Sequence, residues 1–429
     1  MSSSGPLRPL LSDATGEMVV APAGWEALGQ SGRQQVPIER WIPLPPGSTL
    51  MHLPDRWGLA RASSSGRVAT PPGPHLLPVA AVLPVGYLRL LVPAHRHQPG
   101  VTPRTLPLYG YAAVADLNGE VVVAAVRSDD FPAWMGPRPS RPRLQQEVTR
   151  LQRELPRNRV VAQLSVCALE HNCLTAQNTF LGRGEGALPS SAACNADCLG
   201  CISLQTDSGT PASQPRIGRA PTAAELLQVA IRHLQRAQAA QEAGMVSFGQ
   251  GCEGEPLLRE WQLLEVVAEL RRLFPGATIH INTNGSRPQA LRRLLEAGVN
   301  SCRISIFSWR QDLFAAYYRP RGYSIDDVRE SCRVAASLNA QLTINLLTFP
   351  GVTDAPSEVS RTIAALRELR VRQLQWRSLN VDPIWLLDRL PALEPGVGLE
   401  PMMDQVRRAL PHLAMGNFTR PLEALAGTL

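Results

Sequence analysis

The spacing of hydrophobic positions changes about a third of the way along the chain. Up to about residue 130, short apolar runs are broken by Pro and Gly, and "YGYAAVADLNGEVVVAAV" places Asn118-Gly119 between two β-prone segments. An Asn-Gly pair in this setting is typical of a two-residue hairpin turn. The pattern predicts a small, mostly-β N-terminal domain with a flexible tail over residues 1–130.

Beyond this region the pattern becomes that of an α/β protein. A Pro-rich linker and the helical segment "LQQEVTRLQREL" fill residues 131–158, which places a domain boundary near residue 140. Six apolar runs typical of buried strands then alternate with helical segments, from "RVVAQLSVCAL" to "VRQLQWRSL". Strands that alternate with helices form parallel sheets, so residues 159–385 are predicted to fold as a partial (β/α)6 TIM-type barrel. Residues 386–429 are expected to be a C-terminal extension whose amphipathic helix caps the barrel.

Unusual loop sequences follow the predicted strands. "SSAACNADCLGC" follows the first strand, "GCEGEP" the second and "NTNG" the third. In a parallel β/α barrel the loops after the strands share one face, and the chemistry collects there. These motifs are therefore expected to surround one mouth of the barrel.

Composition excludes several chemistries. All 43 Lys+Arg residues are arginine, so a Schiff-base lysine, a pyridoxal-phosphate aldimine and a P-loop lysine are excluded. The formal net charge is +7, but no dense Arg cluster or aromatic-basic interleaving favours a nucleic-acid partner. No apolar segment is typical of a signal peptide or a membrane span. Clustered cysteines favour metal-bound thiolates in a reducing cytoplasm over disulfides.

Three cysteines lie within eight residues of each other. Cys194, Cys198 and Cys201 have the spacing C-x3-C-x2-C. Thiolates select zinc or iron-sulfur clusters, and a structural zinc or an electron-transfer cluster usually has four protein ligands. Three ligands leave one metal position open. The alternative is a zinc knuckle completed by a distant residue such as His171 or Cys173.

On these motifs, residues 159 to 380 or so resemble the radical S-adenosylmethionine (radical SAM) superfamily. The three-cysteine loop after the first strand is its hallmark, and Gly254-Glu255-Pro256 resembles the motif that holds the methionyl amino group. "RISIFS" occupies the place of the ribose-contacting motif, which implies a role for Ser305. Family members often have an aromatic residue where Gly200 stands, which leaves packing on adenine to another side chain. Asn282 and Asn284 are expected to contact cofactor or substrate, or to be ordinary strand-end and turn residues.

The resemblance implies an enzyme with a [4Fe-4S] cluster and S-adenosylmethionine as cofactors. One-electron cleavage would give a 5′-deoxyadenosyl radical that abstracts hydrogen from an unidentified substrate, a small molecule or a peptide. A reductant such as ferredoxin or flavodoxin is implied. The alternative is a non-catalytic iron-sulfur protein, for electron transfer or structure, in which Cys173 or Cys252 supplies a fourth ligand.

Other side chains near the predicted mouth remain open in role. Cys252 and Arg377 are catalytic candidates. Cys167, Cys173 and Cys252 are candidates for an auxiliary metal site, although buried cysteine usually behaves as a small hydrophobe. Arg319 and Arg377 suit a carboxylate or phosphate, or else a salt bridge that closes the barrel.

Overall fold

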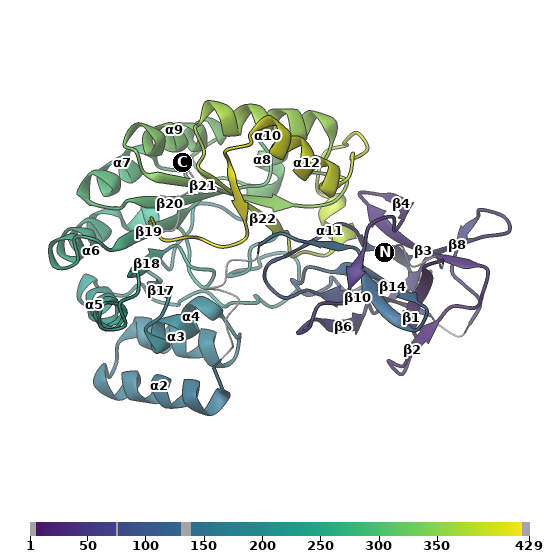
Figure 1. The fold of residues 1–429 in the computed structure, drawn as a ribbon, viewed down its shortest axis with the longest axis horizontal. Coiled ribbons are helices and arrows are strands. Elements are labelled where there is room, and N and C mark those ends of the chain that lie inside the picture. The colour runs from purple at the N-terminus through teal and green to yellow at the C-terminus, as the bar shows by residue number, and fades with distance from the viewer. Residues whose placement is uncertain (1–5, 74–75, 130–138, 423–429) are drawn as a thin grey trace. The chain divides into compact units, whose positions relative to one another are not determined.

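The structure is a computed structural model that describes residues 6–73, 76–129 and 139–422 (Figure 1). Most of the predicted linker therefore lies outside the described residues. The chain forms two compact units. The β unit comprises residues 1–129, 347–363 and 376–410, and the barrel unit comprises residues 130–346, 364–375 and 411–429. No described helix is both long and apolar enough to cross a membrane.

The N-terminal part of the β unit consists of short antiparallel strands, as predicted. They are β1 (Arg8–Ser12), β2 (Met18–Val20), β3 (Trp25–Ser31), β4 (Gln34–Pro37), β5 (Ile42–Pro43), β6 (Thr49–His52), β7 (Arg56–Gly58), β8 (Ala60–Ala62), β9 (Val68–Ala69), β10 (Leu77–Val82), β11 (Tyr87–Arg89), β12 (Val92–Pro93), β13 (His95–His97), β14 (Ala112–Leu117), β15 (Glu120–Val123) and β16 (Ala125–Arg127). One sheet has the order β2-β1-β10-β14-β15-β5 and another the order β12-β3-β8-β9. The predicted hairpin is confirmed: β14 and β15 pair through Leu117 and Glu120, and Asn118 and Gly119 turn the chain with φ of +55° and +90°.

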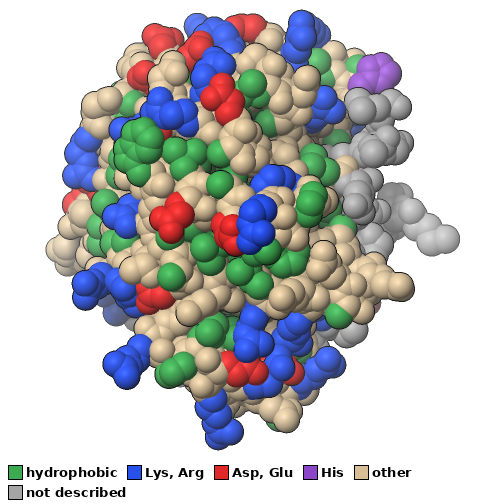
Figure 2. All heavy atoms as spheres, turned by 90° about the vertical axis from the view of Figure 1, so that its left-hand side faces the viewer, with side chains coloured by type: hydrophobic (Ala, Val, Ile, Leu, Met, Phe, Trp, Pro, Cys, Tyr) green, Lys and Arg blue, Asp and Glu red, His purple; other side chains and the backbone are tan. Residues whose placement is uncertain are grey.

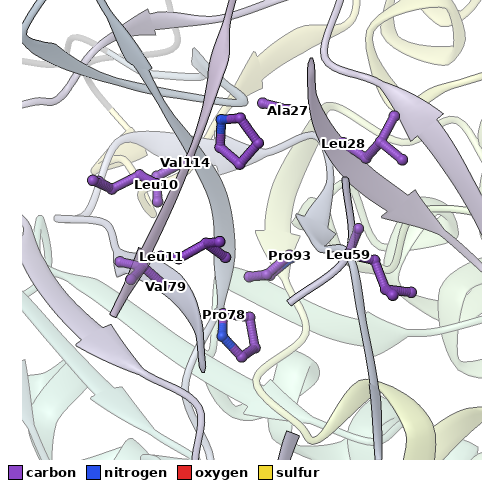
Figure 3. A pocket seen from close by; sticks show the side chains of 11 residues that line it. Leu10, Leu11, Ala27, Leu28, Leu59, Pro78, Val79, Pro93 and Val114 are labelled. Carbon is purple, nitrogen blue, oxygen red and sulfur yellow. The ribbon is translucent and has the colours of Figure 1, made fainter. Parts of the chain in front are cut away.

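The core of the β unit lies on both faces of these strands. Val79, Ala81, Val114 and Val123 form one buried cluster, and Ala80 belongs to another, because successive side chains point to opposite faces. Figure 3 shows a small pocket nearby, lined by apolar side chains such as Leu10. Because every lining residue is apolar, the pocket is a packing gap and not a chemical site.

The barrel unit is built around a curled parallel sheet with helices on its outer side (Figure 1). Its strand order is β17 (Glu185–Ala187), β18 (Met245–Phe248), β19 (Thr278–Thr283), β20 (Ser301–Ile306), β21 (Gln341–Thr348), β22 (Gln373–Ser378) and β23 (Ala414–Gly416), the outer ends of β21 and β22 belonging to the β unit. The helices of the two units are α2 (Arg141–Glu154), α3 (Arg159–Leu169), α4 (Leu174–Leu181), α5 (Ala223–Ala239), the 3-10 helix η1 (Pro256–Arg259), α6 (Glu260–Leu273), α7 (Pro288–Ala297), α8 (Gln311–Tyr318), α9 (Ile325–Ser337), α10 (Pro356–Glu368), α11 (Pro383–Leu387) and α12 (Leu399–Ala409). The partial-barrel prediction is confirmed, with seven strands instead of six.

The two faces of this sheet differ in chemistry. Ile279 and Ile281 of β19 are fully buried, and Cys302 of β20 lies near Cys332 of α9, so this face packs on helices. On the opposite face His280 hydrogen-bonds Ser301 at 2.7 Å. Burying each apolar side chain stabilises the fold by about 1.5–3 kcal/mol.

The last described segment closes the amino-terminal end of the strands. Gln373 donates to Phe418 O at 2.9 Å, and Gln341 donates to Arg420 O at 3.2 Å. Arg303 donates to Thr419 Oγ1 at 3.1 Å. The other part of the predicted C-terminal extension, α12, belongs to the β unit, and its capping role stays a prediction.

One predicted strand is wrong. Residues 159–169 form helix α3, and the first strand is the three-residue β17. Asn158 caps this helix by accepting from Val161 N, and burial of Val160, Leu164 and Cys167 follows a helical period. A short apolar run does not by itself distinguish a strand from a buried helix. The three-cysteine loop still follows the first strand of the sheet.

Candidate active site

A carboxylate fixes the entry to the three-cysteine loop. Glu253, 4% exposed, accepts hydrogen bonds from Ser190 N (2.7 Å), Ser190 Oγ (2.8 Å) and Ser191 N (2.9 Å). Its other oxygen accepts from Gln250 N at 2.6 Å. Burial raises the pKa of Glu253 to about 7 against the effect of these donors. Glu253 thus ties the loop after β18 to the chain that leads into the cysteines.

The G-E-P segment packs directly on the cysteine loop. Gly254 N donates to Ser191 O at 2.7 Å, and Glu255 N donates to Ala193 O at 2.8 Å. A Cβ on Gly254 would lie 1.9 Å from Ala193 O, so only glycine permits this approach. The two loops are therefore built as one surface.

Glu255 joins this surface to the third strand. Buried at 3% exposure, it accepts from Thr283 Oγ1 (2.5 Å), Asn284 N (2.8 Å) and Leu257 N (3.0 Å). Burial raises the pKa of its carboxyl to about 7. Pro256 begins η1, for which Glu255 is the N-cap. The carboxylate thus joins the loop after β18 to the end of β19.

The end of α8 holds the opposite side of the cysteine loop. Leu199 N donates to Tyr317 O at 2.9 Å, and Asp197 N donates to Tyr318 O at 3.0 Å. The Arg321 guanidinium donates to Cys194 O at 2.7 Å. Of this "YYRPRG" segment, only Arg319 was predicted to have a role. Contacts between segments far apart in the chain leave no local sequence pattern.

Arg319 takes the salt-bridge role that was one of its two predicted readings. Its guanidinium pairs with Asp207 at 2.7 Å and with Asp197 at 3.3 Å. Both pairs are partly exposed, so each contributes about 0–1 kcal/mol. Their effect is to hold the cysteine loop against the segment after α8.

The three thiols lie close enough to affect one another. Burial raises the pKa of Cys198 well above its ordinary value, and its neighbours Cys201 and Cys194 raise it further. Burial, then the Glu255 carboxyl, raises the pKa of Cys194 to about 11. Thiols crowded in this way give up their protons readily only when a cation binds the sulfurs. Soft thiolate donors suit an iron-sulfur cluster.

A buried hydroxyl next to these thiols has no partner. Tyr323 Oη makes no hydrogen bond to any described residue, and burial together with Cys198, Glu255 and Cys194 raises the pKa of Tyr323. An unsatisfied buried hydroxyl costs about 1–3 kcal/mol and calls for an explanation. A polar group bound between the cysteine loop and the G-E-P loop would supply one, so the residues present fit a cluster with a polar cofactor beside it.

The third- and fourth-strand candidates have partners within the protein. The Asn282 amide donates to Phe248 O (3.0 Å) and its oxygen lies 2.9 Å from His280 Nε2. Asn284 Nδ2 donates to Asn195 Oδ1 of the cysteine loop at 2.9 Å. Ser305 Oγ accepts from the Asn345 amide at 3.0 Å, which leaves its own proton for a ligand. Asn282 therefore bonds within the sheet and Asn284 bonds to the cysteine loop, and the cofactor contacts of Asn282, Asn284 and Ser305 stay predictions.

The remaining candidates are placed as follows. Cys167 and Cys252 are 1% and 3% exposed, and their thiols are hydrogen-bonded to each other, with Cys173 nearby. Among the described residues no group of three or more His, Cys, Asp or Glu side chains is arranged to hold a metal ion, the cysteine loop included. The auxiliary metal site stays a prediction. Arg377 lies at the end of β22, where its carbonyl accepts from Thr348 Oγ1 at 2.9 Å.

Comparison with known families bears on the cysteine loop and the G-E-P loop together. The model of the radical SAM superfamily matches residues 188–363, the stretch that contains the cysteine loop, the G-E-P loop and Ser305. The chain contains a radical SAM domain. Members of this superfamily bind a [4Fe-4S] cluster and S-adenosylmethionine, and those two groups fit the donor set described above.

Similar solved structures are distant. They include a radical SAM methyltransferase from Sphaerobacter thermophilus, which is 17% identical and has a TM-score of 0.39. The match covers 55% of this chain and 65% of that chain. SuiB from Streptococcus suis bound to S-adenosylmethionine has 12% identity, with 55% and 49% covered and a TM-score of 0.38. TsrM from Kitasatospora setae with cobalamin and a [4Fe-4S] cluster has 14% identity, with 46% and 37% covered and a TM-score of 0.35. The matches span less than two thirds of each of these chains. A search of curated proteins gave no match.

Proposed function

We propose that this protein is a radical SAM enzyme whose [4Fe-4S] cluster, bound by Cys194, Cys198 and Cys201, reductively cleaves S-adenosylmethionine to a 5′-deoxyadenosyl radical that abstracts hydrogen from a substrate. The observation that carries the proposal is the cysteine loop packed against the G-E-P loop, with the unpartnered Tyr323 hydroxyl beside both. Three thiols on one loop leave a fourth metal position without a protein ligand.

The chain's own residues then bind and orient. Gly254, Glu255 and Pro256 would hold the methionyl end of the nucleotide, since the Glu255 carboxyl lies next to Cys194. Ser305, with a hydroxyl proton to donate, would contact the ribose. Positioning of this kind is the protein's contribution in a cofactor enzyme.

An aromatic side chain compensates for Gly200. The Tyr317 hydroxyl is hydrogen-bonded to the Gly200 backbone, and the Tyr317 ring stacks on Phe307 with centroids 4.5 Å apart. We infer that this pair, coming from the fourth strand and α8, supplies the apolar surface that family members often place just before the third cysteine. It would also exclude water from the site.

The substrate class stays open between a small molecule and a peptide, and a ferredoxin or flavodoxin would supply the electron in the cytoplasm. A nucleic acid is not favoured. On the face drawn in Figure 2, arginines (blue) are interspersed with acidic side chains (red). Among the exposed ion pairs, Arg272 lies 2.6 Å from Glu269. A mixed surface of this kind lacks the single-sign stripe of a nucleic-acid binder.

The test is turnover. The chain is reconstituted anaerobically with iron and sulfide, reduced with dithionite and supplied with S-adenosylmethionine, and 5′-deoxyadenosine is measured by mass spectrometry. The proposal is supported if Cys198→Ser abolishes the formation of 5′-deoxyadenosine and Cys332→Ala retains it. Cys332 is the control because it is a buried residue of α9, outside the cysteine loop. A cluster that forms but yields no 5′-deoxyadenosine would favour the electron-transfer alternative.

A further inference from the structure

One arginine points at a sulfur of the cysteine loop. The Arg216 Nη2 donates to Cys201 Sγ at 3.7 Å, and Arg216 Nε donates to Ser203 Oγ at 3.1 Å. Ser203 Oγ itself lies 3.4 Å from Cys201 Sγ. The guanidinium, the hydroxyl and the sulfur therefore form one connected group in which the sulfur receives a charged donor.

The backbone of Arg216 is held in place by several hydrogen bonds. Arg216 N donates to Ser203 O at 3.0 Å, and the next residue, Ile217, donates to Cys252 O at 2.8 Å. Gln163 Nε2 donates to Pro215 O at 2.9 Å. The segment that carries the arginine is thus fixed to the cysteine loop, to the G-E-P loop and to α3.

The charge of Arg216 has no acidic counterpart among the described residues. It makes no ion pair with any Asp or Glu in that part of the chain, unlike Arg319. Its charge also acts on Cys194, whose thiol pKa it lowers against the effect of burial. A half-buried guanidinium that donates to the Cys201 sulfur and to no carboxylate is arranged for an anionic sulfur.

We propose that Arg216 is a tuning residue that donates a charge-assisted hydrogen bond to the Cys201 thiolate and raises the reduction potential of the cluster. This inference rests on the proposed function. On reduction one electron enters the cluster and no bond or proton is exchanged, so the cluster becomes more negative by one charge. A cation and an N–H donor at a cluster sulfur stabilise that reduced form more than the oxidised form.

The chain offers a matched control for the loss of charge. Arg219 lies three residues further along the same segment and is exposed, with no hydrogen bond or ion pair among the described residues. Arg216→Met removes both donors and the charge at similar length. Arg216→Lys keeps the charge and loses the planar fork. Ser203→Ala removes the hydroxyl between the guanidinium and the sulfur.

The experiment is a dithionite redox titration of each reconstituted protein, followed by electron paramagnetic resonance without S-adenosylmethionine. Arg216→Met should shift the midpoint to lower potential, so that the reduced-to-oxidised ratio at fixed potential falls about tenfold, the effect of one charge-assisted hydrogen bond. Arg216→Lys and Ser203→Ala should shift it less, and Arg219→Met should leave it unchanged.

The results separate this inference from the proposed function. Full iron content with the same midpoint in wild type, Arg216→Met and Arg219→Met would overturn the tuning role and leave the enzyme proposal intact. A wild type that forms no four-iron cluster would overturn the proposed function itself. If Arg216→Met fails to hold iron, Arg216→Lys and Ser203→Ala decide, since wild-type midpoints in both would overturn the inference.

Discussion

Replacing Glu253 by glutamine should weaken the junction between the G-E-P loop and the cysteine loop. The carboxylate accepts four hydrogen bonds, three of them at one oxygen from Ser190 and Ser191, and the fourth from Gln250 N. A glutamine can direct its carbonyl oxygen at the three donors only by presenting its NH2 group to the Gln250 N–H. That N–H, which is partly buried, then loses its acceptor.

The magnitude follows from the groups left unpaired. A buried donor without a partner costs about 1–3 kcal/mol, so Glu253→Gln should lower the free energy of unfolding by about that amount. Glu253→Ala leaves three backbone N–H groups without this acceptor and should cost roughly two to three times as much. Iron uptake on reconstitution should fall in the same order, because Ser190 and Ser191 lead into the cysteine loop.

The assay is urea unfolding followed by circular dichroism at pH 8, above the pKa of about 7 of Glu253, with iron per chain measured in parallel. Glu242→Gln is the control, because Glu242 is exposed, and it should change stability by less than about 0.5 kcal/mol. A Glu253→Gln protein as stable as the control, with full iron uptake, would refute the reasoning.

Three further predictions concern the framework. Arg56→Met should destabilise the protein by about 3–5 kcal/mol in urea unfolding, because it leaves the buried Asp382 without its counter-charge, both side chains being 1% exposed. Arg104→Met, at an exposed ion pair, should cost less than about 1 kcal/mol. Similar losses in the two variants would contradict this prediction. Burial raises the pKa of Glu225, but hydrogen bonds from Thr222 and Arg159 outweigh burial and lower this pKa to about 2. Its contribution is therefore present above the unfolded pKa of about 4.5 and is lost as pH falls toward 2, so the stability gap between wild type and Glu225→Gln should shrink between pH 5 and pH 3; a constant gap would contradict it. Gly249→Ala should cost more than about 1 kcal/mol, since φ is +79° and the new Cβ would lie 1.8 Å from a backbone oxygen of β19; a wild-type melting temperature would argue against this.

Local patterns predicted what depends on local physics. Helix α5 begins after Thr222, where the Thr222 hydroxyl and the Glu225 carboxylate form a capping box, so the start of this helix depends on residues close together in the sequence. The Asn118-Gly119 hairpin was predictable from the sequence because a turn with two φ angles above zero favours these two residues. The cysteine motif was recognisable in the sequence because its three cysteines lie on one loop.

Long-range contacts were not predictable from the sequence. Residues 159–169 form a helix because their apolar face packs within the barrel unit, and β17 is too short to show a strand pattern. Glu253 looks like any acid in a glycine-rich loop until Ser190 and Ser191 are placed opposite it. Tyr323 becomes notable only once its hydroxyl is buried near Cys198 without a partner.

The most direct test of the open-iron claim is electron paramagnetic resonance of the reduced, reconstituted protein with and without S-adenosylmethionine. The account predicts a four-iron signal that changes when the nucleotide is added, because the iron without a protein ligand binds it. Cys198→Ser should remove the signal. A four-iron signal that is identical with and without the nucleotide would mean that the protein fills the fourth position, and would contradict the account.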